Sequence, residues 1–217
     1  MAANSHDWFR YFFLGRCALI PLSILGAALC YRWARDLYGF WPGVAALALW
    51  CFCPNMIAHG ATVSADAGAA ALGVAAGYAC WRWLSTSTRT SAALAGVALG
   101  LAELAKSQWI VLFALWPLLW CAHRRCSASR RMGRGPPLGQ LAAVWLLGLL
   151  VLNAGYGFTG SLLPLGDYRF ASRALGGTTL PGANRFSETW MADLRVPLPK
   201  DYVTGLDLQK LDWTFAN

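Results

Sequence analysis

Charged side chains are scarce in this sequence of 217 residues, because Asp, Glu, Lys and Arg together make up only 13% of it. A soluble globular domain has about 25%. Apolar residues reach 57%, and 12 of them are Trp. The shortage of charge argues against a water-soluble enzyme, and the apolar excess argues against a disordered tail. The composition is typical of a chain that lies in a membrane.

Paired cysteines and the common catalytic fingerprints are missing as well. The seven Cys lie in or beside apolar stretches, and none falls in residues 158–217. This placement argues against a disulfide framework. Cys51-Phe52-Cys53 has neither a second Cys pair nor a His at zinc spacing, so we interpret it as apolar filler. The fingerprints of hydrolases, P-loop proteins and dinucleotide-binding domains are absent.

Apolar segments instead dominate the first 157 residues, and a membrane-spanning helix needs about 20 such residues. The sequence therefore predicts an all-α fold, a polytopic transmembrane bundle of about six helices over residues 1–157. An irregular tail over residues 158–217 follows on the outer face. The expected segments are 13–31, 38–58, 67–84, 91–105, 108–122 and 136–157.

The net charge of +8 is unevenly placed along the chain. Residues 1–158 hold 12 Lys and Arg against 4 acids, whereas residues 159–217 hold 6 against 6. Alternating crossings put nine of the 12 on one side and Arg10, Arg16 and Lys106 on the other. The positive-inside rule makes the nine-cation side cytoplasmic, which predicts a multi-pass protein of the cytoplasmic (inner) membrane with an extracytoplasmic tail. A charge excess explained by topology argues against a nucleic-acid partner. The nine are Arg32, Arg35, Arg82, Arg89, Arg124, Arg125, Arg130, Arg131 and Arg134.

Both ends of the sequence predict that it is an internal piece of a longer protein. Residues 1–7 lack the basic region of a signal peptide, yet the first segment must enter with Arg10 and Arg16 outside. A preceding helix would resolve both problems. The sequence also stops within a polar stretch, residues 211–217.

Small residues and a polar turn mark the middle segments. Gly73-x-x-x-Gly77 and Gly96-x-x-x-Gly100 predict close helix packing. The segments 91–105 and 108–122 are each about 15 residues long, or about 22 Å. Because the hydrocarbon core is about 30 Å thick, the polar turn from Glu103 to Gln108 is expected in a recess below the outer surface.

Asp66 is the first candidate for chemistry, because a carboxylate at a membrane helix must be paired, hydrated or bound to a cation. Two interpretations are open. It is a helix cap or a first-turn acid favoured by the helix dipole, a role that Ser64 shares. Alternatively, it lies in an outward-facing aqueous cavity as a metal ligand or as the charge partner of a substrate.

Four further side chains have a structural and a functional interpretation each. Arg16 either extends to the interface or binds a phosphate with its guanidinium. Glu103 and Lys106 either neutralise one another on a helix face or form a phosphate contact in which Glu103 holds Lys106. His59 is an interfacial polar residue or a ligand.

The order of these features resembles the early membrane helices of the GT-C glycosyltransferases that use lipid-linked sugars. The nearest in kind are the protein O-mannosyltransferases and the lipid A aminoarabinose transferases, and the resemblance covers residues 8–122. The stretches that carry it are Arg16-Cys-Ala-Leu-Ile-Pro-Leu-Ser-Ile-Leu-Gly26, Tyr31-Arg-Trp-Ala-Arg35-Asp-Leu-Tyr-Gly39, Pro54-Asn-Met-Ile-Ala-His-Gly60, Ser64-Ala-Asp66 and Gly96-x-x-x-Gly100-Leu-Ala-Glu-Leu-Ala-Lys106.

The resemblance implies transfer of a sugar from a polyprenyl phosphate to an acceptor on the outer face. Asp66 would then match the second acid of the family, near a divalent metal ion or the acceptor. Arg16 and Lys106 would match the cations that bind the donor phosphate, and His59 and Glu103 would belong to the same substrate-binding region. Positive charge there would stabilise the departing phosphate.

One departure from the family pattern limits this expectation. The first acidic motif of the family follows its first helix, and Asp7 lacks that context. A general base is therefore missing, and we expect the isolated chain to be inactive. The alternatives are a transporter or lipid flippase and a non-catalytic membrane scaffold. Matched broken helices, which are typical of transporters, are not visible in the sequence.

Overall fold

The computed structural model describes residues 8–62, 64–129, 135–177 and 182–215. Its contacts divide the chain into two units, residues 1–144 and 145–217. The boundary lies inside helix α7 (Leu138–Gly155), whereas the sequence-based boundary at residue 157 follows that helix. Each unit is described by itself below.

The first unit begins with a long apolar helix, α1 (Trp8–Tyr38), of 31 residues, which extends beyond the predicted 13–31 at both ends. At 1.5 Å per residue it is about 46 Å long. Arg35 lies in its last turn, where a cation is favoured by the helix dipole. Gly39 ends the helix with φ of 96°, and its amide donates to the Arg35 carbonyl at 2.9 Å.

The next apolar segment was predicted as one helix over 38–58, and the structure corrects this. It contains α2 (Phe40–Phe52) and α3 (Pro54–Ala61), which are bent by 50° at the break. The reason is Pro54, which cannot donate a backbone hydrogen bond and disfavours a helical conformation in the residue before it. Cys53 is accordingly extended, with ψ of 121°.

The helix α4 (Ala65–Thr86) runs parallel to α1. A methyl group built on Gly68 would meet Leu22, one on Gly26 would meet Ala71, and one on Gly77 would meet Trp33. Because these contacts advance together along both helices, α1 and α4 run in the same direction.

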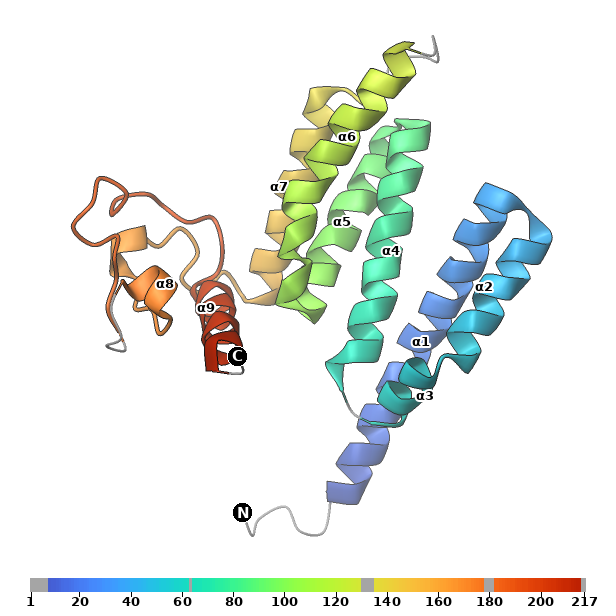
Figure 1. Ribbon diagram of the computed structural model, residues 1–217, viewed down its shortest axis with the longest axis horizontal. Coiled ribbons are helices and arrows are strands. Elements are labelled where there is room, and N and C mark those ends of the chain that lie inside the picture. The colour runs from blue at the N-terminus through green and yellow to red at the C-terminus, as the bar shows by residue number, and fades with distance from the viewer. Residues whose placement is uncertain (1–7, 63, 130–134, 178–181, 216–217) are drawn as a thin grey trace. The chain divides into compact units, whose positions relative to one another are not determined.

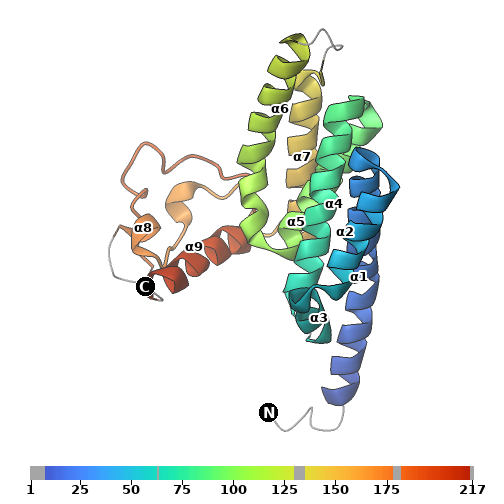
Figure 2. The same cartoon turned by 45° about the vertical axis from the view of Figure 1, so that its right-hand side comes forward.

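The helices α5 (Arg89–Ala105) and α6 (Val111–Ser129) continue the unit, joined by the short 3-10 turn η2 (Ser107–Ile110). Figures 1 and 2 both show α4 and α5 side by side. Gly73, Gly96 and Gly100 are buried, as the small-residue motifs predicted. Near the C-terminal end of α4, Trp83 is fully buried, and its indole N–H donates to the Gln140 side chain at 3.0 Å.

Helices account for the regular structure of the described residues, so the all-α prediction is confirmed. The number of spans is smaller than predicted. By length and composition α1 and α7 are able to cross a membrane, and the bent pair α2–α3 makes a third candidate. The six-span bundle is therefore not established. The helix α5 has only 17 residues, and α4 is rich in Ala and Gly rather than in larger apolar residues.

The two ends of the first unit differ in charge. The α1–α2 turn, the α4–α5 turn and the end of α6 lie at one end, and the start of α1, the α3–α4 link and η2 lie at the other (Figure 1). Arg32, Arg35, Arg82 and Arg89 belong to the first of these ends, which we call the arginine end. Arg130, Arg131 and Arg134 lie outside the described residues. The separation of charge agrees with the predicted topology, while the sidedness stays a prediction.

The part of the second unit between α7 and its last helix is mostly irregular, whereas that last helix of 16 residues departs from the irregular tail predicted over residues 158–217. After α7 the unit contains the turn η3 (Leu165–Asp167), the short helix α8 (Arg173–Gly176) and α9 (Lys200–Phe215), with two isolated β-bridges. The carboxylate of Asp207, 2% exposed, accepts hydrogen bonds from the Ala171 amide and from the amide and hydroxyl of Ser172. A buried side chain of α9 therefore holds the start of α8.

We expect Gly73→Ala to destabilise the first unit. The added methyl group would lie 2.1 Å from the Trp109 ring, so the ring must move. Overpacking of this kind costs about 1–3 kcal/mol. The matched control is Gly139→Ala, where nothing lies within 4 Å. The thermal unfolding midpoint in detergent should fall for the first variant only, and equal midpoints would contradict the packing described here.

In the second unit, Asp207→Ala should loosen the contact between α8 and α9. It leaves buried amides without an acceptor, which costs about 1–3 kcal/mol for each group. Hydrogen exchange at the amides of Ala171 and Ser172 should accelerate in this variant. Asp193→Ala, an exposed carboxylate of the same unit, is the control and should leave both amides protected.

Candidate functional site

Asp66 lies in the first turn of α4, before the apolar part of that helix. Ser64 occupies the N-cap position, but its side chain makes no capping hydrogen bond. Its hydroxyl lies 3.3 Å from His59 Nδ1 instead. The first-turn position favours an acid through the helix dipole, as the structural interpretation predicted. The carboxylate also contacts two side chains that the structural interpretation did not include.

The carboxylate of Asp66 is paired with Lys106, which lies 40 positions later in the chain. Lys106 Nζ donates to Asp66 Oδ1 at 2.7 Å. Lys106 is the C-cap residue of α5, where the backbone turns to an extended conformation with φ of −158° and ψ of 121°. The end of α5 thus delivers an ammonium group to the start of α4.

His59 reaches the other oxygen of the same carboxylate. Its Nδ1 lies 3.5 Å from Asp66 Oδ2, and its position follows from α3, which the break at Cys53 turns toward the α4 start. The sequence named Asp66, Lys106 and His59 separately. The structure brings these three together, and we call them the Asp66 cluster.

The electrostatics of the cluster favour an ionised Asp66. The hydrogen bond from Lys106 and its positive charge hold the pKa of the Asp66 carboxyl below its ordinary value, with a smaller contribution from His59 against slight desolvation. The side chains of Asp66 and Lys106 are 42% and 36% exposed. Solvent therefore reaches and screens the pair, and both groups are accessible to a ligand.

A cavity of about 280 Å³ lies against the pair. One wall is the indole of Trp109, whose Nε1 donates to the Ala69 carbonyl at 3.2 Å. The remaining wall combines small and apolar side chains with one amide. The lining residues are Asp66, Ala69, Ala70, Lys106, Gln108, Trp109 and Val111. The cavity thus joins one charge pair to an aromatic face.

Sequence reasoning placed Gln108 in the polar turn expected to lie in a recess, but it missed Trp109 and Val111 as cavity residues. The signal that was available is the change from the apolar face of α5 to the polar turn that begins at Glu103. A Trp directly after such a turn is able to fold back over a stripe of Ala and Gly. The recess was predicted from this polar turn. In the structure, Lys106 and Gln108 of the turn line the cavity, and the ring of Trp109 forms one wall.

Arg16 belongs to the same end of the unit as the Asp66 cluster. Leu22 contacts the Gly68 position and α1 is parallel to α4, so Arg16, six residues before Leu22, lies about 9 Å further toward the helix start. Its side chain is exposed. Its proposed role on a phosphate stays a prediction.

Glu103 is buried, with the residue only 1% exposed, and it lies on the packed face of α5 with Leu99 and Gly96, while its role in binding a substrate stays a prediction. The sequence linked Lys106 to Glu103, three residues away, whereas the structure gives Lys106 an ion pair with Asp66 on another helix. The reason is the end of α5, because the extended backbone at Lys106 turns its side chain off the helix face.

The divalent cation predicted at Asp66 lacks further support from this geometry. Lys106 lies on one carboxylate oxygen and His59 is near the other. Over the described residues no group of three His, Cys, Asp or Glu side chains gathers for a metal. A cation at this position would have to share the Asp66 carboxylate with the ammonium group of Lys106.

The cluster combines a positive group, a carboxylate held ionised and an imidazole beside one cavity. An ammonium group at a protected site binds a phosphate as a point charge. The carboxylate and the imidazole are able to accept hydrogen bonds from a hydroxyl. The arrangement is therefore suited to a ligand that carries a phosphate and hydroxyls.

Comparisons with protein-family models, with curated proteins and with solved structures found no match to this chain.

The pKa of Asp66 should depend on Lys106. In Lys106→Gln we expect it to rise toward its ordinary value, because the hydrogen bond and the positive charge are both lost. Since the pKa is lowered in the folded protein, the stabilisation from the pair is present above the ordinary carboxyl pKa and is lost as the pH falls through the lowered value. A ¹³C NMR titration of labelled Asp measures this, with Lys106→Arg as the control that keeps the charge. An unchanged Asp66 titration in Lys106→Gln would contradict the pairing.

Proposed function

We propose that this chain is the membrane part of a glycosyltransferase that takes a sugar from a polyprenyl phosphate. The acceptor receives the sugar at the end of the first unit opposite the arginine end. The observation that supports this most is the ion pair of Lys106 and Asp66 at the edge of a cavity. The resemblance to GT-C enzymes names the same two residues.

Phosphate binding is assigned to Lys106, with Arg16 as the second cation from the same end. When the bond between the sugar and the phosphate oxygen breaks, negative charge grows on the departing phosphate. A cation placed beforehand stabilises that charge more than it stabilises the intact donor, which accelerates the step. The chain supplies this stabilisation without a covalent intermediate.

Asp66 has two effects in this proposal. It orients Lys106 before the donor arrives, and as an ionised carboxylate it accepts a hydrogen bond from a hydroxyl of the sugar or of the acceptor. When the acceptor oxygen forms its bond to the sugar, its proton must leave to a base. We assign that base to no residue of this chain.

The competing explanation is that the pair only joins α4 to α5. The two explanations differ in what Asp66→Asn does. A purely structural pair is broken equally by Asp66→Asn and Lys106→Gln. In a phosphate site, Asp66→Asn removes the charge that neutralises Lys106, so an anionic lipid should bind at least as well.

The test is photocrosslinking of the protein in nanodiscs with a diazirine-labelled polyprenyl phosphate. We expect labelled peptides from 64–70 and 106–111. Lys106→Gln should lower the labelling about tenfold, the loss of one charged hydrogen bond. Asp66→Asn should keep or raise the labelling while abolishing sugar transfer by the complete protein.

Two control variants accompany these measurements. Asp36→Asn removes a carboxylate at the arginine end, and Lys200→Gln removes a lysine of the second unit, so both should label like the parent protein. Labelling that is unchanged in Lys106→Gln, or that falls equally in Asp66→Asn, would refute the proposal and favour a scaffold. Labelling found only in peptides of α1 would refute the assignment of Lys106 as the phosphate ligand.

A further inference from the structure

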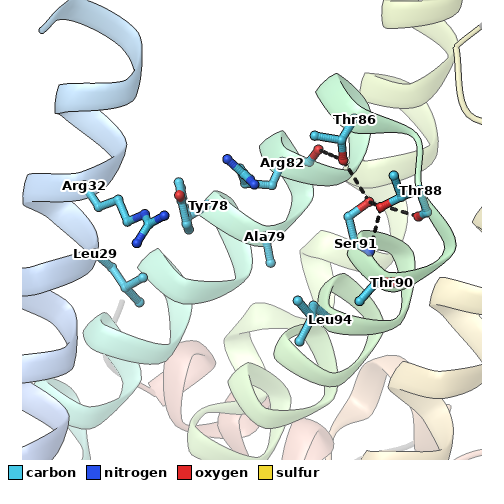
Figure 3. Close-up of a pocket in the computed structure, with 10 residues that line it drawn as sticks. All are labelled: Leu29, Arg32, Tyr78, Ala79, Arg82, Thr86, Thr88, Thr90, Ser91 and Leu94. Atoms are coloured by element: carbon cyan, nitrogen blue, oxygen red, sulfur yellow. Dashed lines mark hydrogen bonds between the residues drawn. The ribbon is translucent and has the colours of Figure 1, made fainter.

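A second cavity of the first unit lies at the arginine end, on the other side of the unit from the Asp66 cluster. It has a volume of about 490 Å³ and is bounded by α1, α4 and the start of α5 (Figure 3). Pockets for organic ligands span about 300–1,000 Å³. Arg32 of α1 and Arg82 of α4 both point toward Tyr78, which lies between them (Figure 3). Leu29 and Leu94 form an apolar wall below.

Both arginines have their charge available to a ligand. Among the residues that the structure describes, neither Arg32 nor Arg82 forms an ion pair, and both side chains are exposed. Asp36 lies four residues after Arg32 on α1, and its carboxylate accepts a hydrogen bond from the Tyr78 hydroxyl at 2.9 Å. Arg32 also borders another cavity with Asp36 and Arg35. Together, Arg32, Arg35, Arg82 and the carboxylate of Asp36 carry a formal charge of +2.

The start of α5 adds to the positive potential without supplying a separate site. Thr88 caps the helix by accepting from the Ser91 amide at 3.2 Å. The hydroxyls of Thr86, Thr88 and Ser91 bond to one another and to backbone carbonyls. These hydroxyl groups line the cavity, but their hydrogen bonds are already used within the protein. The positive end of the α5 dipole lies beside the cavity.

Aromatic side chains place this cavity at the level of lipid headgroups. Tyr78 stacks on Trp81 with ring centres 5.8 Å apart and contacts Trp33 at 6.1 Å. Trp and Tyr gather where a membrane helix meets the interface. The chain also has helices that are able to cross a membrane. Arginines beside such a group of aromatic side chains are typical of the level of lipid headgroups.

We infer that this cavity binds one anionic phospholipid, with Arg32 and Arg82 facing its phosphate from either side of Tyr78 and an acyl chain along Leu29 and Leu94. A guanidinium group binds phosphate oxygens through a planar fork of N–H donors. A free phosphate would leave the apolar wall and most of the volume without a contact. The bound lipid would link α1 to α4 and α5. This inference does not depend on the proposed function, since it concerns the opposite end of the unit.

The test is native mass spectrometry of the full protein with phosphatidylglycerol or with phosphatidylcholine, using Arg32→Gln/Arg82→Gln. We expect the parent protein to retain one phosphatidylglycerol in preference to phosphatidylcholine. The double variant should lose about tenfold in apparent affinity for each arginine. The matched control is Arg124→Gln/Arg125→Gln, which removes the same charge from the same end through α6. It should bind like the parent protein.

Each other outcome overturns the inference. An equal loss in the α6 control would show general attraction of anionic lipids rather than a site. Equal retention of phosphatidylcholine would remove the phosphate-selective role of the arginines, and displacement by millimolar inorganic phosphate would indicate an ion site only. If the double variant does not fold, Arg32→Lys and Arg82→Lys replace it. These variants keep the charge but lose the fork, and they should bind less than the parent; binding equal to the parent would again refute the inference.

Discussion

The ion pair of Lys106 and Asp66 is the interaction on which the candidate site depends. It connects the last residue of α5 to the first turn of α4, across 40 positions of sequence. A carboxylate at the end of an apolar helix is stabilised when it is paired, and Lys106 pairs this one. Because the pair is partly exposed, its attraction is screened and either partner can exchange for a ligand. The same contact thus holds the helices and leaves a charged group available.

The two ends of the first unit carry cations for different reasons. At the arginine end, several guanidinium groups lie beside Tyr and Trp, as expected where a protein meets lipid headgroups. At the other end the cations are few, and Lys106 forms an ion pair with a carboxylate. The two ends therefore differ in how their cations are neutralised: among the described residues, Arg32 and Arg82 form no ion pair, whereas Lys106 is paired with Asp66.

Much of the helical frame was predictable from apolar length alone, whereas the partners of the polar residues were not. Composition and spacing placed Asp66 and Lys106 in the right region, but the nearest charge in sequence, Glu103, was expected to hold Lys106. The local backbone decides otherwise, since Lys106 leaves the helical conformation and Glu103 stays on the packed face. The break at Pro54 was visible in the sequence, yet the run of apolar residues outweighed it in the prediction. That break is what brings His59 to the cluster.

Small residues in the core determine the shape of the site as well as the packing. Gly73 has no side chain, so the Trp109 ring occupies the space against α4 and its indole donates to the Ala69 carbonyl. The ring then walls the cavity in which Lys106 meets Asp66. A larger residue at position 73 would move the ring and with it the cavity wall. The glycine motif, which by itself indicates only close helix contact, therefore fixes one side of the binding region.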